Sequence, residues 1–182
     1  MQPTLLKILS IPLISLFLSA CGSGSATIIL TPERIASYNG SWQSACSYNR
    51  NTDLTSIETL YVSDTEYTIY IDEFDNNNCF GSSDYTTEIE GYLYFGDYIP
   101  YASNYCDNTI EVDFTAAVIF EDGIQIASSE ISAYLNLPSN TSHNIMCTRD
   151  GELFTGDLSL YDGRRDSSRP LSMNYNKPLQ AF

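Results

Sequence analysis

The chain has 182 residues, of which 43% are hydrophobic, 13% aromatic and 17% charged, and this length suits a single domain. Eight Lys and Arg residues stand against 23 Asp and Glu residues, so the formal net charge at pH 7 is −15. Phosphates would be repelled by that charge, which excludes nucleic-acid binding through a basic face. The single His leaves little for metal sites or acid–base relays, so no metal and no cofactor are expected.

Residues 1–20 have the features of a signal peptide. Lys7 is the only charge in this segment, and it precedes an apolar run over residues 8–18 that ends in small residues. The run is shorter than the roughly 20 residues that a membrane-spanning helix needs. A charged start, a short apolar run and a small-residue end are typical of export signals. We therefore expect an exported protein.

The end of this segment, Leu18-Ser19-Ala20-Cys21, resembles a bacterial lipobox, where a peptidase cuts before a lipidated Cys. The resemblance implies a diacylglyceryl thioether on Cys21 and an amide-linked acyl chain, such as palmitate, on its amine. Several acyl chains form a stable membrane anchor. Gly22 in the next position implies the outer membrane of the envelope. Residues 21–30 are then the lipidated Cys and a flexible tether, and residues 31–182 form one β domain.

The first elements expected after the tether are a short helix and four strands. Thr31-Pro32-Glu33-Arg34 predicts the start of a helix, with Thr31 as N-cap and Pro32 in the first helical position. Ser63-Asp64 predicts a tight turn between two strands, and Gly91 predicts a bulge or a bend within another. The strands are predicted from their content of Tyr, Ile, Val and Thr, over residues 41–48, 56–63, 65–74 and 86–95.

The second half of the chain predicts further antiparallel strands. Apolar and polar residues alternate over residues 110–120, which is typical of a half-buried strand with its even-numbered residues facing the core. Asp122-Gly123 and Asp150-Gly151 are strong hairpin signals, and they lead into strands predicted over residues 124–137 and 152–161. No helical periodicity of useful length appears among these segments. We therefore predict an all-β, up-and-down antiparallel barrel, with a β-sandwich as the alternative.

The cysteines other than Cys21 predict two disulfides. Cys46, Cys79, Cys106 and Cys147 are an even number in an oxidising compartment, and four cysteines allow three connectivities. Sequential pairing, Cys46 with Cys79 and Cys106 with Cys147, suits a meander of antiparallel strands. No C-x-x-C pair occurs, which disfavours a metal site or a redox catalyst.

Gly40-Ser41-Trp42, placed after the short helix and at the first strand, resembles the lipocalin fingerprint. The resemblance implies that Gly40 and Trp42 close the bottom of the barrel, with Trp42 packed under an Arg from the far end of the chain. Arg169, within Ser168-Arg169-Pro170-Leu171, is the candidate for that contact. The longer pattern over residues 38–178 is similar to small bacterial envelope lipoproteins with a lipocalin-like domain. It implies no shared activity beyond a small barrel that holds an apolar ligand.

Two segments carry side chains that could form a chemical site. Residues 72–78 carry carboxylate and amide oxygens that suit Ca²⁺, but an EF-hand loop would need Gly and Glu where Phe80 and Thr86 stand. A solvated hairpin loop is the simpler interpretation. His143 is the only candidate base, in a segment over residues 139–144 that is expected to be an exposed loop without a nucleophile motif. No catalytic residue is therefore predicted, and we expect a protein that is not an enzyme.

Tyrosines are concentrated over residues 92–101, with Tyr61, Tyr67 and Tyr70 elsewhere in the sheet. They suit either a ligand cavity or the half-buried faces of strands. The sequence predicts a lipid-anchored, non-enzymatic barrel that binds a small apolar or amphipathic ligand, its other partner being the membrane. The alternative is a structural or protein-interaction module with a filled barrel. Neither the ligand-binding residues nor the oligomeric state is indicated.

Overall fold

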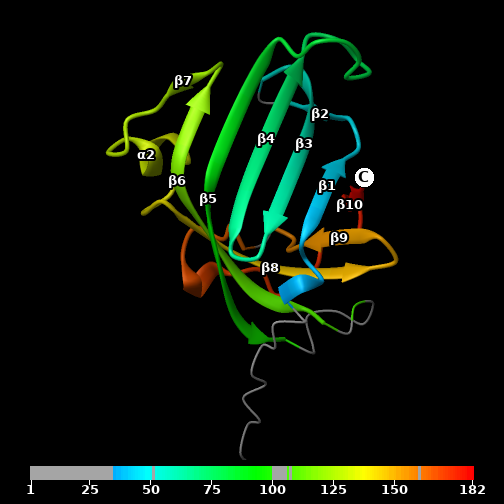
Figure 1. Cartoon of the computed structure of the whole chain (residues 1–182), viewed down its shortest axis with the longest axis vertical. Coiled ribbons are helices and arrows are strands. Elements are labelled where there is room, and N and C mark those ends of the chain that lie inside the picture. Colours follow the sequence, from blue (N-terminus) through cyan, green and yellow to red (C-terminus); the bar gives the residue numbers. More distant parts are fainter. Residues whose placement is uncertain (1–34, 51, 100–105, 107, 160) are drawn as a thin grey trace, which may run out of the picture.

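Eight antiparallel strands close into a barrel in the part of the chain that the structure describes (Figure 1). The computed structural model describes residues 35–50, 52–99, 106, 108–159 and 161–182. The strands follow one another around the barrel in chain order, as in an up-and-down meander. They are β1 (Gly40–Ser44), β3 (Leu54–Ser63), β4 (Glu66–Phe74), β5 (Tyr85–Tyr98), β6 (Ile110–Glu121), β8 (Thr141–Arg149), β9 (Glu152–Thr155) and β10 (Leu179–Ala181).

The first strand closes the barrel because it pairs on both sides. Trp42 of β1 lies opposite Leu60 of β3 and opposite Ala181 of β10, in antiparallel register with each. The predicted barrel is confirmed, and the sandwich alternative is not. Two shorter strands pair with strands of this ring. β2 (Ser47–Asn49) pairs with the start of β3, and β7 (Ile124–Gln125) pairs with the end of β6.

Turn chemistry explains the hairpins. Asp64 has a φ of 55° between β3 and β4, which confirms the predicted turn there. Asp122-Gly123 and Asp150-Gly151 also have positive φ at both residues, with values of 49° and 77° in the first pair and 55° and 82° in the second. Two such residues in a row form the turn type that matches the twist of paired strands, so both predicted hairpins are confirmed.

The ladder between β5 and β6 is irregular at Gly91, as predicted. Gly91 pairs with Ala116 while Glu90 pairs with Val118, so Ala117 is an extra residue on β6. A Cβ on Gly91 would lie 2.1 Å from the carbonyl oxygen of Thr115, and only glycine permits that approach. The bulge also shifts the inward phase of β6 from even to odd residues after Ala116. The predicted unbroken alternation to residue 120 is therefore wrong, and Ile119 is the buried residue instead.

The strand predicted over residues 124–137 is wrong. Only β7 is extended, and the chain then forms the helix α2 (Ile131–Tyr134). Ile131 is buried, and Leu135, four residues later, packs against the same core. Residues four positions apart lie on one face of a helix, so both side chains reach the core from α2. Residues two positions apart share one face of a strand, so the apolar residues of this segment also fit a strand pattern. The helix lies at the end of the barrel where β6 ends and β8 begins (Figure 1).

Two other predicted strands differ in extent. Residues 41–48 form β1 and β2 with a break between them, where Cys46 is bonded to Cys79. The last predicted strand, over residues 152–161, ends at Thr155, because Gly156 forms an isolated bridge with Met173 instead. The chain then crosses the outside of the barrel, through the 3-10 helix η1 (Asp166–Ser168), before it returns as β10.

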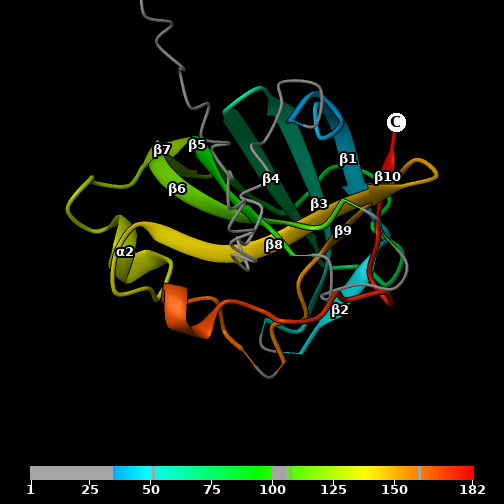
Figure 2. The same cartoon turned by 90° about the horizontal axis from the view of Figure 1, so that it is seen from below.

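The described residues pack into two apolar clusters separated by the barrel wall. Met146 of β8 belongs to the interior cluster, while its neighbours Ile145 and Cys147 belong to an outer one. The segment between β9 and β10 covers this outer cluster, and Figure 2 shows it running outside β8. The interior cluster includes Tyr38, Trp42, Leu60, Val62, Leu93, Ile110, Val112, Met146, Leu153 and Leu179; the outer one includes Ile99, Cys106, Ile145, Cys147, Phe154 and Met173.

Both predicted disulfides are present with the favoured pairing. Cys46 and Cys79 join the β1–β2 connection to the segment after β4, with 5.8 Å between their Cα atoms. Cys106 and Cys147 lie in the outer cluster, with Cα atoms 6.0 Å apart. Two structural disulfides in a domain of this size indicate an extracytoplasmic protein.

Several predictions fall on the first 34 residues, which lie outside the described part. These are the signal peptide over residues 1–20, lipidation at Cys21, the tether over residues 21–30 and the helix start at Thr31. Ile35 and Ala36 are helical and lead into the turn before β1. Of the helices that the structure describes, none is long and apolar enough to cross a membrane.

Trp42 offers a test of the interior packing, because it is the only Trp in the chain. Its side chain is buried in the interior cluster, and its indole N–H donates to the carbonyl oxygen of Tyr38 at 3.0 Å. Replacing Trp42 by Ala should lower the free energy of unfolding by about 3–5 kcal/mol through lost burial and a cavity. Trp42→Phe should cost less. Urea unfolding measures both, and a red-shifted, freely quenched emission from the folded protein would contradict the buried placement.

Candidate functional site

The interior of the barrel is not completely filled. A cavity of about 330 Å³ lies in the half of the barrel where β6 ends and β8 begins. Tyr38 and Trp42 help to fill the other half, and the Tyr38 hydroxyl donates to the carbonyl oxygen of Asn108 at 2.7 Å. The cavity is open to solvent on the side of α2. Its lining comprises Glu58, Leu60, Tyr67, Ile69, Ile89, Phe114, Leu135, Leu137, Ser142, Asn144, Thr155, Leu158 and Leu179.

The walls of this cavity are mostly apolar because inward-facing residues of seven strands meet there. Leu60, Ile69 and Ile89 stand in one row, since Ile69 pairs with Leu60 across β3–β4 and with Ile89 across β4–β5. Tyr67 and Phe114 form an edge-to-face pair with ring centroids 5.2 Å apart. Burial raises the pKa of the Tyr67 phenol well above its ordinary value of 10.0, so this group stays neutral at physiological pH.

The mouth of the cavity is bordered by residues that follow regular elements. Leu135 and Leu137 come from the end of α2 and the turn after it, and Leu158 comes from the segment after β9. Asn144 lies on the wall nearby, where its side-chain oxygen accepts from the backbone N–H of Ile145 at 2.8 Å and of Gly156 at 2.9 Å. The bond from Gly156 holds the end of β9 against β8. The mouth is therefore built partly from segments outside the strands.

Glu58 is the one charged residue in the cavity lining that the structure describes. It pairs with Ile71 across β3–β4, and its backbone N–H donates to the Ser44 hydroxyl at 2.8 Å. Its side chain is exposed, and part of its open surface lies in the cavity lining. Partial loss of hydration beside the surrounding protein raises the pKa of the Glu58 carboxyl above its ordinary value of 4.5, and Lys177 opposes the rise to a smaller extent.

A second hollow lies outside the barrel. It has a volume of about 480 Å³ and separates the β1–β2 segment, including Gln43 and Cys46, from the last residues of the chain, including Lys177 and Phe182. Its lining is drawn from one barrel edge and a terminal segment, and it contains no carboxylate or His. The interior cavity is smaller, but strands surround it and a single ionisable carboxyl faces it. We therefore take the interior cavity as the candidate site.

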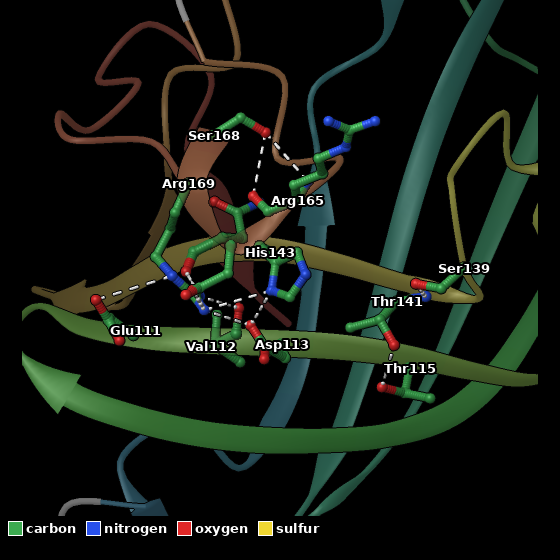
Figure 3. A network of polar contacts seen from close by, with 12 residues as sticks. Glu111, Val112, Asp113, Thr115, Ser139, Thr141, His143, Arg165, Ser168 and Arg169 are labelled. Carbon is green, nitrogen blue, oxygen red and sulfur yellow. Dashed lines mark hydrogen bonds and ion pairs between the residues drawn. The ribbon is translucent and has the colours of Figure 1, made fainter.

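A polar network on the outer face of the barrel holds the crossing segment in place (Figure 3). Arg169 is buried, and its Nη1 donates to the carbonyl oxygens of Val112 and Asn144 at 3.1 and 2.8 Å. Its Nη2 donates to carboxylate oxygens of Asp113 at 2.7 Å and Asp166 at 2.8 Å. The hydrogen bond from Arg169 lowers the pKa of Asp166 below its ordinary value of 3.8.

His143 belongs to this network, so the expectation of an exposed loop is wrong. It lies on β8 directly opposite Asp113, and its Nδ1 is 2.8 Å from the Asp113 carboxylate. The strand β8 begins at Thr141, before the predicted loop ends, so His143 lies within the paired strand. The Nη2 of Arg169 lies 3.4 Å from the same ring nitrogen. The His–Asp pair therefore packs against a cation, and this arrangement suits a structural role.

The residues of the G-x-W pattern and Arg169 lie on opposite sides of the barrel wall. Gly40 has a φ of 144°, which favours glycine, and Trp42 faces the interior. The guanidinium of Arg169 instead bonds to Asp113, which alternates with the inward-facing Val112 on β6. Among the contacts of the described residues, the structure does not bring Arg169 and Trp42 together. A role in closing the barrel stays a prediction for Gly40, Trp42 and Arg169.

The remaining candidate groups are dispersed. Asp72 lies within β4 and accepts a hydrogen bond from the Thr86 hydroxyl at 2.7 Å. In the described ranges, no three His, Cys, Asp or Glu side chains are grouped so that they could hold a metal ion. Of the tyrosines considered, Tyr67 lines the cavity, whereas Tyr61 and Tyr92 are exposed on the outside.

Glu58 is the site residue that the sequence analysis missed. The signal was present, because Leu60 and Val62 are buried in β3 and a period of two places Glu58 in the same inward row. The chain contains 23 acidic residues, so composition alone does not distinguish Glu58 from the others.

The fold and the site define a class: a small, closed, eight-stranded antiparallel β-barrel of an extracytoplasmic protein, with a cavity in its interior. No protein-family model matches this chain, and no curated protein matches it significantly.

The Arg169 network predicts a specific loss of stability. Arg169→Met should lower the free energy of unfolding by about 2–4 kcal/mol, because it leaves buried carbonyls and the Asp113 carboxylate without their donor. Arg169→Lys should lower the free energy of unfolding less than Arg169→Met, because Lys keeps the positive charge. It should still cost some stability, since an ammonium group lacks the planar set of donors of the guanidinium. The bond to Asp166 stabilises the fold above the ordinary carboxyl pKa of 3.8 and is lost as pH falls through the lower folded value.

The difference between the parent and Arg169→Met should therefore narrow below about pH 4, as measured by urea unfolding at pH 7 and pH 3. Equal stability of the parent and Arg169→Met at pH 7 would show that the network does not hold the crossing segment.

Proposed function

We propose that this protein is a lipid-anchored envelope lipoprotein whose lipocalin-like barrel binds a small amphipathic molecule and catalyses no reaction. The observation that carries the proposal is the interior cavity of about 330 Å³, with walls from seven strands and an open mouth. Apolar cavities with a few polar groups are the usual form of small-molecule sites. A barrel with only a structural role has no need of such a space.

The volume limits the size of the ligand. It lies near the lower end of the roughly 300–1,000 Å³ typical of ligand pockets. It would hold about ten water molecules at liquid density. This space suits a short alkyl chain or one to two small ring systems with a polar group, rather than a long-chain lipid.

The proposed location follows from the sequence motif and the disulfides together. The lipobox ending at Cys21 supports attachment of acyl chains, and Gly22 supports release to the outer membrane. The two disulfides support an oxidising compartment, which the periplasm and the cell surface provide. The membrane is then a partner through Cys21, and the formal net charge of −15 argues against nucleic acid as another.

The alternative is an interaction module, and the tyrosines on the outside of the sheet favour it. Tyr61, Tyr92 and Tyr94 are exposed to 40%, 48% and 60%, and Tyr61 makes edge contacts with Tyr70 and Phe182. Tyr is common at protein interfaces. The unfilled half of the barrel supports ligand binding over this alternative.

Binding in the cavity can be tested with a neutral fluorescent probe, N-phenyl-1-naphthylamine, on residues 22–182, which contain the whole described barrel and both disulfides. Ser142→Trp should fill the mouth, because Ser142 lines the cavity, and should weaken probe binding about tenfold or more. Thr141→Trp is the matched control, since Thr141 precedes it on β8 and its hydroxyl bonds to Thr115 on the other face. The affinity of this control variant for the probe should stay within about threefold of the affinity of the parent protein.

Two results of this titration would contradict ligand binding in the barrel. One is the absence of saturable probe binding by the parent protein. The other is binding that Ser142→Trp and Thr141→Trp alter equally. Either would favour the interaction module.

The anchor is tested separately by Cys21→Ala in cells that express the full chain. Without the thiol there is no thioether, so the variant should leave the membrane fraction or accumulate as the uncut precursor. The protein that retains Cys21 should be membrane-bound and heavier than its polypeptide by the mass of the acyl chains. An unchanged membrane partition, together with an unmodified mature mass, would contradict lipidation.

A further inference from the structure

The inward direction of Glu58 is set by the strand. Leu60 and Val62, two and four residues later on β3, are 2% and 5% exposed in the interior cluster. Glu58 stands in the same row, beside Ile71 on the neighbouring strand. An outward direction would turn this whole row of β3 out of the core, because side chains alternate along a strand. The fold therefore holds a carboxyl group against apolar walls.

The carboxyl group of Glu58 makes no hydrogen bond or ion pair with any residue that the structure describes. Lys177 is near enough to affect its titration, but the described ion pairs do not include one between them. A carboxylate has about four acceptor positions, and in the exposed Glu58 they are open to whatever enters the cavity. A ligand that brings a positive charge and N–H donors to this position would form charge-assisted hydrogen bonds with it.

The charge of the whole protein points in the same direction. Its formal net charge of −15 attracts small cations and repels small anions on their approach to the mouth. A fatty acid or another carboxylate would meet Glu58 as a like charge. A neutral alcohol could donate only one hydrogen bond.

We propose that the ligand of this cavity is a small amphipathic amine, whose ammonium group pairs with the Glu58 carboxylate while its apolar body lies against Ile69, Ile89 and Phe114. This inference rests on the proposed function, since it names the class of ligand for the same cavity. Glu58 is then the residue that determines specificity, and the apolar walls supply most of the buried contact.

The test compares three ligands of equal chain length, octylamine, octanol and octanoate, by calorimetric titration of residues 22–182 at pH 7. Octylamine should bind about tenfold or more tightly than octanol, because a charge-assisted hydrogen bond exceeds a neutral one, and octanoate should bind most weakly. Glu58→Gln should weaken the binding of octylamine about tenfold or more, and it should change the affinity for octanol by less than about threefold. Glu90→Gln is the matched control, because Glu90 is exposed on β5 and its loss changes the net charge equally.

The pH dependence gives a second readout. Octylamine stays protonated from pH 5 to pH 8, since alkyl ammonium groups have a pKa near 10.4. Its affinity should therefore fall as the Glu58 carboxyl becomes protonated at acid pH, and this fall should be absent in Glu58→Gln. The binding of octanol should be the same across this range in both proteins.

Glu58→Gln is expected to fold. The pKa of Glu58 is raised in the folded state, so its ionisation weakens the fold as pH rises above the ordinary value of 4.5 and through the folded value. The variant escapes this loss and should melt at the same temperature as the parent or higher at pH 7, with a smaller difference at pH 4.

The outcomes separate the two proposals. If octanol binds as tightly as octylamine, or if Glu58→Gln binds octylamine as the parent does, the amine proposal is wrong while ligand binding in the cavity stands. If none of the three ligands binds and the neutral probe does not bind either, the proposed function itself fails.

Discussion

The pairing of β1 with both β3 and β10 is the constraint on which the structure depends. Each of these contacts is short, since β1 has five residues and β10 has three. Without them the sheet would have two open edges and no enclosed interior. Trp42 lies opposite Leu60 on one side and Ala181 on the other, so the same strand pairing closes the barrel and places Trp42 in its interior. The cavity exists only because the ring is complete.

Closure in turn depends on the path by which the chain reaches β10. The segment between β9 and β10 must cross the outside of the barrel, and it covers a second apolar cluster on the way (Figure 2). Arg169 fastens this crossing by bonding to the carbonyls of two neighbouring strands and to Asp113 at once. The Cys106–Cys147 disulfide strengthens the same face. The outer face thus positions the last strand, and the last strand forms part of the cavity wall through Leu179.

Local features were predictable from the sequence, and long-range ones were not. The Asp-Gly turns and the alternation at the start of β6 depend on neighbouring residues, so the barrel could be predicted from them. The segment holding Ile131 and Leu135 was misassigned because its apolar spacing fits a strand or a short helix equally well until the barrel end is there to be covered. The contacts of Arg169 with Val112 and Asp113 join residues more than 50 positions apart, and no local sequence pattern predicts them. Glu58 differs, since the inward phase of β3 was sufficient to place it.

The cavity joins two properties. Apolar walls favour a ligand with little polarity, while one carboxyl without a partner in the described structure favours a ligand with a positive end.

The central claim is that the barrel holds a small molecule in its interior. Native mass spectrometry of the protein purified without denaturation from the cells that produce it tests this most directly. We predict a species heavier than the covalent mass by one small ligand, which is released on unfolding and is absent when Ser142 is replaced by Trp. A native mass equal to the denatured mass, for protein that remains folded and has both disulfides intact, would contradict the claim.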